Sequence, residues 1–168
     1  MAEVTCPSPF SATGSLDASA RIELLAVNSL DRVSWNPLDK AAGIVLSNGD
    51  LTLSIPSAIY GSARDTRSVS SGKWYWEIKV DAYSGHIMQV GIGNAAASLS
   101  QSVGSDANSY GYEASNGKKA HGSETSYGSA YGLNDIIGVA LDLDKGKIGW
   151  SIKEAGQNTV HPAVGTDM

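Results

Sequence analysis

The strongest constraint on the fold is the alternation of apolar and polar side chains in the segment SGKWYWEIKV, residues 71–80. The apolar positions are Trp74, Trp76, Ile78 and Val80, and the polar positions between them are Lys73, Tyr75, Glu77 and Lys79. Because successive side chains of a strand point to opposite faces of a sheet, this period of two predicts a strand with one buried and one wetter face. The segment MQVGIG, residues 88–93, continues the alternation.

A hairpin signal lies in the segment IVLSNGDLTLSI, residues 44–55. The dipeptide Asn48-Gly49 is typical of a two-residue type I′ turn, since both positions of that turn need a positive φ. A turn centred there places the apolar side chains of both strands on one face. The predicted pairs are Ser47 with Asp50, Leu46 with Leu51, and Ile44 with Leu53.

A second hairpin signal lies in IIGVALDLDKGKIGWSI, residues 136–152. A turn at Lys145-Gly146 again collects the apolar side chains on one face, and its first pair has opposite charges. The predicted pairs are Asp144 with Lys147, Leu143 with Ile148, Leu141 with Trp150, and Val139 with Ile152. Two hairpins with consistent registers predict an all-β fold, an antiparallel β-sandwich.

Length and charge limit the function classes. A chain of 168 residues is long enough for one domain, and its 19 glycines follow no fixed period, which suits many tight turns. The net charge of -5 gives no long-range attraction to phosphate backbones, so a nucleic-acid partner is disfavoured. Cys6 is the only cysteine, which excludes an internal disulfide. No stretch approaches the roughly 20 apolar residues needed for membrane insertion.

The sequence divides into two parts. Residues 1–33 begin with a stretch rich in Ser, Thr, Pro and Ala and continue into a segment that fits either a helix or a strand. We expect them to form a flexible N-terminal arm, of which residues 1–15 order only on contact with something else. Residues 34–168 carry the strand and hairpin signals and are the predicted β-sandwich.

Four segments in this order resemble the SPRY domain, the core of the larger B30.2 module. They are SVSSGKWYWEIKV, VGIG, SYGYEASNGKKAHG and DIIGVALDLDKGKIGWSI. Together they extend the resemblance over about Trp35 to Ile152, some two-thirds of the chain. The resemblance implies a bent, concanavalin-like jelly-roll sandwich whose loops at one end bind a protein or carbohydrate partner, and it implies no catalysis.

The stretch WNPLDKAAGIVLSNGDLTL, which leads into SGKWYWE, is similar to SPRY-like modules of bacteriophage virion proteins, especially tail and fibre components. This likeness implies a virion decoration or adhesion protein, made in the host cytoplasm. Its arm would anchor it, as a homo-oligomer, to a capsid or tail protein, and its loops would attach to a host surface protein or glycan. A stand-alone protein- or peptide-recognition adaptor and a carbohydrate-binding module are the alternatives.

The C-terminal end departs from the family pattern. Members normally follow the Trp150 strand with a loop and a final strand, whereas here HPAVGTDM, residues 161–168, ends the sequence. We therefore expect the final strand to be missing, which would leave an open sheet edge of the kind that promotes aggregation. Either residues 20–28 or a neighbouring subunit is expected to cover that edge.

The candidate binding residues are loop aromatics and basic side chains. Rigid tyrosines among small polar residues are typical of adaptable binding surfaces, although they also fill glycine-rich loops. For the arginines, a local salt bridge to Asp65 is the simpler reading. The candidates are Tyr83, His86, Tyr110, Tyr127, Tyr131, Arg64 and Arg67. The expected core aromatics are Trp74, Trp76 and Trp150.

Catalysis is not expected. His121 lies beside Ser123 and Glu124, but adjacent loop residues cannot hold a nucleophile and its base in the geometry of a triad. The pairs Asp142/Asp144 and Glu77/Asp81 read as solvated strand faces, and DLDKGK offers too few acids for a calcium loop. We therefore predict no enzyme activity, no cofactor and no metal.

Overall fold

The computed structural model describes residues 2–3, 33–55, 60–84, 87–153, 160–161 and 166–167. Every regular element among them is a β-strand, and no helix in this part of the chain is long and apolar enough to cross a membrane. Most of the predicted N-terminal arm, residues 4–32, lies outside the described residues.

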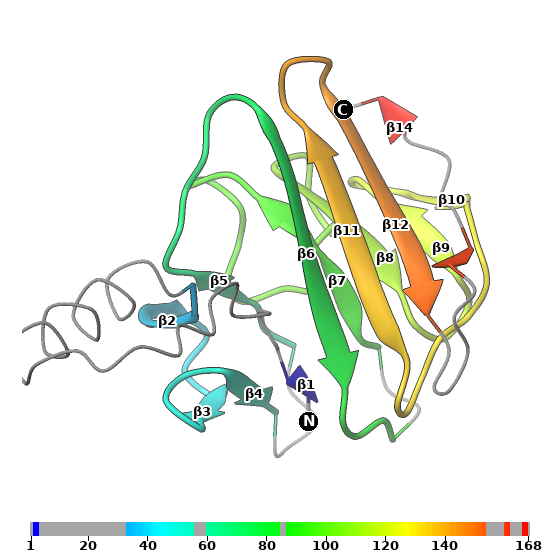
Figure 1. Cartoon of the computed structure of the whole chain (residues 1–168). Coiled ribbons are helices and arrows are strands. Elements are labelled where there is room, and N and C mark those ends of the chain that lie inside the picture. The colour runs from blue at the N-terminus through cyan, green and yellow to red at the C-terminus, as the bar shows by residue number, and fades with distance from the viewer. Residues whose placement is uncertain are drawn as a thin grey trace, which may run out of the picture.

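The strands form three antiparallel sheets (Figure 1). The largest has eight strands and runs β13 (Val160–His161), β12 (Lys147–Lys153), β11 (Ile136–Asp142), β6 (Lys73–Val80), β1 (Ala2–Glu3), β4 (Thr52–Ser54) and β3 (Val45–Ser47), with β14 (Thr166–Asp167) also paired to β12. The second has four strands and runs β10 (Glu124–Ser126), β9 (Lys118–Ala120), β8 (Ser109–Glu113) and β7 (Gln89–Gly93). The third pairs β2 (Trp35–Lys40) with β5 (Ala63–Asp65).

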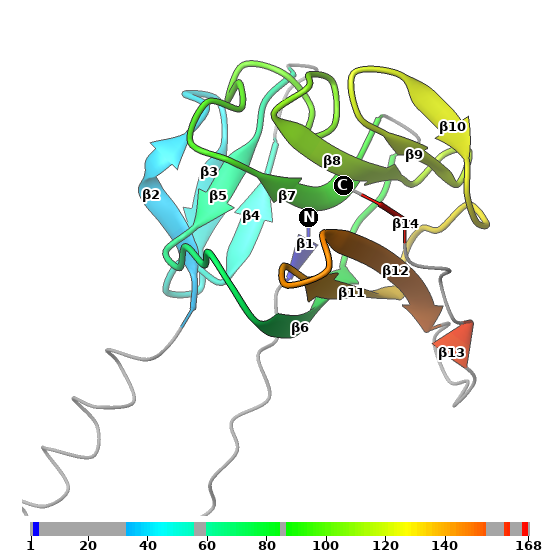
Figure 2. The same ribbon diagram turned by 90° about the horizontal axis from the view of Figure 1, so that it is seen from above.

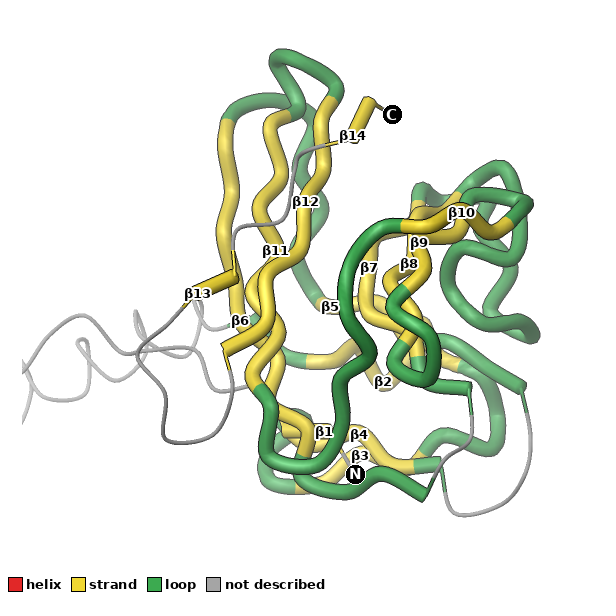
Figure 3. Tube along the Cα trace, turned by 90° about the vertical axis from the view of Figure 1, so that its right-hand side faces the viewer, coloured by secondary structure: helices red, strands yellow, loops and turns green. Residues whose placement is uncertain are grey.

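The larger sheets lie face to face as the two layers of a sandwich. Figures 2 and 3 show β6, β11 and β12 in one layer and β7, β8 and β9 in the other. Side chains from both layers fill the space between them, among them Ile78, Val80, Val90, Tyr112, Ile137, Val139, Leu141, Ile148 and Trp150. The predicted all-β antiparallel sandwich is therefore confirmed.

A cluster of aromatic rings joins the layers. The ring of Tyr112, on β8, lies 5.8 Å from that of Trp150, on β12, and Tyr127 meets both rings edge-on. The Tyr127 hydroxyl accepts a hydrogen bond from the Trp150 backbone N–H at 2.8 Å, and the Tyr131 hydroxyl donates to the Tyr112 carbonyl at 2.8 Å. Burial raises the pKa of Tyr112 to about 12 and that of Tyr131 well above its usual value.

The first hairpin forms, but its register differs from the prediction by two residues. Leu46 pairs with Leu53 instead of Leu51, so residues 48–51 make a four-residue loop. Three successive residues of that loop have positive φ, namely Asn48 (55°), Gly49 (62°) and Asp50 (63°). The dipeptide therefore marks the turn correctly, while the residue after it extends the left-handed stretch and lengthens the loop.

The second hairpin shows the same shift. Trp150 pairs with Val139 instead of Leu141, and the turn spans the four residues 143–146, with Gly146 at a φ of 60°. Four-residue hairpin loops are common, and they are most often built around a type I turn. A slip of two residues returns every side chain to the same face of the sheet, so the apolar pattern cannot distinguish the two registers.

The edge of β12 is paired within the chain. Lys153 and Ile152 pair with Val160 and His161 of β13, and the start of β12 pairs with β14. The final strand was expected to be missing, but two strands of two residues each, β13 and β14, lie at that edge. Strands of two residues are too short to show an alternation of apolar and polar side chains, and Pro162 and Gly165 lie between them in the sequence.

The N-terminal residues that the structure describes lie elsewhere in the same sheet. β1 pairs with both β6 and β4, so it connects the hairpin of β3 and β4 to the rest of the sheet. Residues 20–28, one of the predicted covers for the edge of β12, lie outside the described residues. The pairing partners of that edge are therefore the C-terminal strands β13 and β14.

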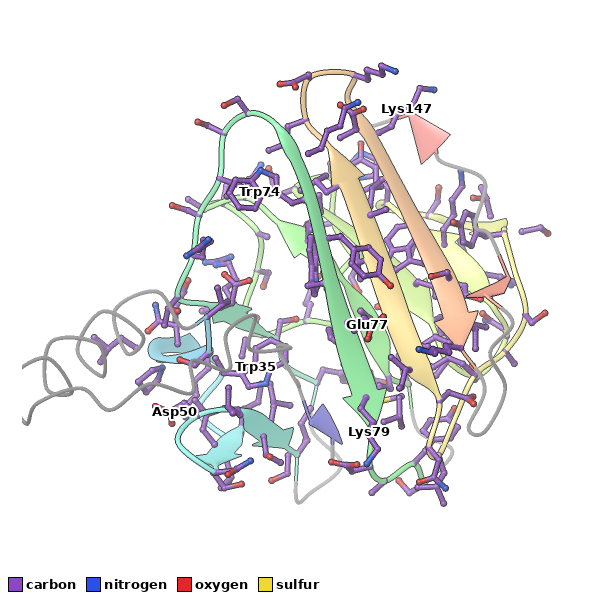
Figure 4. All side chains as sticks on the ribbon, in the orientation of Figure 1. Trp35, Asp50, Trp74, Glu77, Lys79 and Lys147 are labelled. Atoms are coloured by element: carbon purple, nitrogen blue, oxygen red, sulfur yellow. The ribbon has the colours of Figure 1, made fainter. Side chains whose placement is uncertain are left out.

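The three expected core tryptophans differ in burial. Trp150 is buried and Trp76 packs partly buried against the core, but Trp74 is 37% exposed. Figure 4 shows Trp74 near the start of β6, beside the loop that leads into the strand. Its ring lies 5.9 Å from the guanidinium carbon of Arg67, and its Nε1 donates to the Ser71 carbonyl at 2.8 Å. The prediction is wrong for Trp74, because this end of β6 packs against its own loop.

Replacing Trp150 with alanine should lower the free energy of unfolding by about 3–5 kcal/mol, because it leaves a cavity where the two layers meet. Urea denaturation followed by far-UV circular dichroism measures the loss. The matched control is Trp74→Ala, which removes the same side chain from a half-exposed position and should cost less than about 1.5 kcal/mol. Equal losses in the two variants would contradict the assignment of Trp150 to the centre of the fold.

Candidate functional site

The candidate tyrosines are turned inward to different degrees. Tyr131 is only 4% exposed, which leaves too little surface for a partner. Tyr83, Tyr110 and Tyr127 are partly buried and pack against the core. Tyr110 lies on β8 and not in a loop, and a binding role for all three stays a prediction. His86 lies outside the described residues.

The two candidate arginines have structural partners. Arg64 forms a bidentate ion pair with Asp39, with Nε–Oδ2 at 2.7 Å and Nη2–Oδ1 at 3.1 Å. The expected partner of Arg64 was Asp65. Its Nη1 also donates to the carbonyls of Asn94 and Ala97, so it fixes the start of the connection between β7 and β8. Arg67 lies over the Trp74 ring, and its backbone N–H donates to Asp65.

The residues that suggested a triad are not arranged as one. The His121 ring stacks on Tyr110 at 3.9 Å, and its Nδ1 lies 3.0 Å from the carbonyl oxygen of Ser109. Glu124 forms an ion pair with Lys118 at 2.9 Å. In the described parts of the chain, no three His, Cys, Asp or Glu side chains come together in a way that could hold a metal ion.

A small hollow lies on the outer face of the four-stranded sheet. It has a volume of about 220 Å³. Its floor is formed by Gln89 of β7, Glu113 of β8 and Glu124 of β10, and the loop segment 100–105 forms a wall. Tyr60 and Ile87 stand at its rim. Both rim side chains are well exposed, at 69% and 50%.

Strand geometry places the floor residues. Gln89 and Glu113 are directly opposite each other in the β7–β8 pair, and the next pair, Val90 with Tyr112, faces the core. Because side chains alternate along a strand, Gln89 and Glu113 point away from the core. Rigid strands therefore hold these two polar groups at the bottom of the hollow.

The floor is rich in hydrogen-bond acceptors. Gln89 Nε2 lies 3.4 Å from Glu113 Oε2, and the Ser115 hydroxyl donates to the other oxygen of Glu113. Glu113 is only 4% exposed. Gln89 Oε1 is buried and has no hydrogen-bond partner among the described residues. A buried acceptor without a donor is costly, so a donor that reached this atom after a small side-chain movement would be stabilised.

The wall of the hollow is held against the sheet by close backbone contacts. A Cβ atom on Gly111 of β8 would lie 2.2 Å from the carbonyl oxygen of Val103, so only glycine allows this approach. The Gly122 N–H donates to the Gly104 carbonyl at 2.9 Å, and the Gly104 N–H donates to the Ser109 hydroxyl at 2.8 Å. In Figure 2 the connection between β7 and β8 lies on the side of these strands that is turned away from β6, β11 and β12.

Asp106 closes the wall loop. Its carboxylate accepts hydrogen bonds from the Ser98 N–H at 2.9 Å, the Ser109 hydroxyl at 2.7 Å and the Asn108 N–H at 2.9 Å. The Ser98 bond and then the Ser109 bond lower the pKa of Asp106 below its usual value. The loop that forms the wall is therefore ordered by a carboxylate within it.

The comparisons with known proteins identify the family. The SPRY domain model matches residues 73–164, more than half of the chain. The chain belongs to the SPRY domain family. SPRY domains generally serve as non-catalytic modules of protein–protein interaction. The resemblance carried by the four motifs is thus confirmed at the level of the family.

Two curated relatives are both eukaryotic proteins. The Set1 complex component ash2 of Schizosaccharomyces pombe is 30% identical over 68% of this chain and 18% of its own length. The ATP-dependent RNA helicase DDX1 of Xenopus laevis is 30% identical over 73% of this chain and 16% of its own length. The chain therefore spans under a fifth of the length of these relatives. Neither relative supports the closer likeness to bacteriophage modules.

Two solved structures share the fold. The TRIM65 PSpry domain superposes with a TM-score of 0.65 and 16% identity, covering 88% of this chain and 86% of that one. A chain of the stonustoxin structure superposes with a TM-score of 0.63 and 18% identity, covering 81% of this chain and 23% of that one. At these identities the likeness shows the architecture alone.

Asp106→Asn should lower the stability of the protein towards urea, and the size of the loss should depend on pH. Because the folded-state pKa is lowered, the carboxylate's contribution to stability is complete above the ordinary Asp pKa of about 3.9 and is lost as the pH falls through the lowered value. The urea midpoint of the variant should therefore lie below that of the wild type at neutral pH, and the gap should narrow towards about pH 2.5. A gap that stays constant over this range would contradict the role of the charge.

Proposed function

We propose that this domain recognises a segment of a protein partner in the hollow between the β7–β8–β10 floor and the wall at residues 100–105. The observation that carries the proposal is the buried, unpartnered Gln89 Oε1 at the floor. Two exposed side chains, Tyr60 and Ile87, line the same hollow. The rest of the lining is polar, so the hollow offers hydrogen-bonding groups beside two apolar side chains.

The size of the hollow supports a peptide side chain as the occupant. Sites for small molecules usually have volumes of about 300–1,000 Å³ and enclose most of the ligand. A volume of about 220 Å³ fits one long side chain, with the rest of the segment lying over the rim. Protein interfaces concentrate their binding energy in such anchor positions.

Membership of the family supports the same class of function. SPRY domains generally serve in protein–protein interaction, and one curated relative is by name a component of the Set1 complex. A role within a larger assembly is therefore consistent with the relatives. The adaptor alternative from the sequence is the one that these observations favour.

The virion role stays a prediction from the sequence. Anchoring to a capsid or tail protein, attachment to a host surface, homo-oligomer formation and location in the virion rest on the bacteriophage-like stretch at residues 35–53. Glycan binding likewise stays a prediction. The aromatic ring that the hollow offers for stacking on a sugar is that of Tyr60.

A displayed library of random peptides tests the proposal. The immobilised full chain should enrich related sequences, and Ser105→Trp, which fills the hollow from its exposed wall, should weaken their binding at least about tenfold. Ser68→Trp is the matched control, since Ser68 is also an exposed loop serine but does not line the hollow. No enrichment, or equal binding by both tryptophan variants, would refute recognition at this site.

A further inference from the structure

We propose that the hollow recognises an arginine side chain of the partner segment. This inference rests on the proposed function and names the chemistry of its anchor. It follows from the donors and acceptors that line the floor, from the burial of one carboxylate and from the two exposed side chains at the rim.

The floor offers acceptors and lacks a matching donor. Gln89 directs its NH₂ group to Glu113, with Nε2 3.4 Å from Oε2, an orientation that suits an accepting carboxylate oxygen. That orientation leaves Gln89 Oε1 buried and without a partner in the described parts of the chain. An incoming group must therefore donate to the amide oxygen and tolerate a neighbouring carboxylate.

Glu113 adds a charge that its neighbours compensate only in part. Its side chain is 4% exposed, and it forms no ion pair with any described residue. Lys118, on the adjacent strand, attracts Glu113 electrostatically, but its ammonium lies 2.9 Å from Glu124 Oε2. Glu124 is in turn hydrogen-bonded to Glu113, so one lysine is shared by two acidic side chains. A buried carboxylate is costly unless it is paired, so a cation from outside would be favoured here.

A guanidinium meets these demands better than an ammonium. Its planar fork presents several N–H donors in fixed directions, so one group can donate to Gln89 Oε1 and to Glu113 at the same time. Hydrogen bonds between a guanidinium and a carboxylate are charge-assisted and roughly twice as strong as neutral ones. Glu124, at the other side of the floor, adds negative potential even though Lys118 shares it.

The rim can accommodate the aliphatic part of the same arginine side chain. Tyr60 and Ile87 line the hollow and are 69% and 50% exposed. The aliphatic part of an arginine can pack on such surfaces while its head enters a polar site, and an aromatic ring also attracts the cation itself. The net charge of -5 would further draw a basic segment towards the domain.

Nuclear magnetic resonance of the ¹⁵N-labelled full chain tests this chemistry without a known partner. The probe is Nα-acetyl-arginine methylamide, and its neutral counterpart is Nα-acetyl-citrulline methylamide. The arginine probe should shift the Gln89 side-chain amide and the backbone amides of residues 100–105 and 113 in a saturable way. The citrulline probe should bind at least about tenfold more weakly, because it lacks the charge.

Three variants complete the test. Glu113→Gln should weaken the arginine probe about tenfold or more. Gln89→Lys should abolish binding while keeping the protein folded, because its ammonium supplies the missing cation opposite Glu113. Glu77→Gln is the matched control, since Figure 4 shows Glu77 on β6, in the other sheet, where its carboxylate accepts from the Tyr75 hydroxyl.

The outcomes separate this inference from the function on which it rests. Equal affinity for arginine and citrulline, shifts that map away from the hollow, or full binding by a folded Gln89→Lys protein would each overturn the arginine assignment. Library peptides that lack arginine but lose binding in Ser105→Trp would also overturn it and leave protein recognition standing. If the library yields no binder at all, protein recognition fails, whatever the arginine probe shows.

Discussion

The contact between Tyr112 and Trp150 is the interaction on which the rest of the molecule depends. It joins β8 of one sheet to β12 of the other, and Tyr127 fixes it by bonding to the Trp150 backbone. Because strand side chains alternate, the position after Tyr112 on β8 points outward, and that residue is Glu113. The residue that anchors the core thus also sets the direction of the buried carboxylate in the hollow.

The sequence predicts the fold class well but not the strand register. Alternation at residues 71–80 and the turn glycines identify the strands, and the burial of Ile78 and Val80 agrees with that alternation, whereas that of Trp74 does not. Both hairpins are shifted by two residues, a difference to which a pattern with a period of two is blind. The short strands β13 and β14 give no pattern at all, because two residues make less than one full alternation.

The candidate site was predictable only in part. Loop tyrosines suggested a binding surface, but core packing holds them, whereas the hollow is formed by strand residues that alternate with core positions. The sequence feature that could have indicated the hollow is Glu113, an acidic residue between an aromatic strand position and a glycine-rich turn. What no sequence pattern could supply is the folding of the wall loop over Gly111, which brings residues 100–105 beside Gln89 and Glu113.

A double-mutant cycle on Tyr112 and Trp150 tests the central claim most directly. Tyr112→Leu, Trp150→Leu and the double variant are compared by urea denaturation. If the two rings join the layers, the single losses should fail to add, with a coupling of about 0.5–1.5 kcal/mol beyond the burial of area. Additive losses, with no coupling beyond experimental error, would contradict the account.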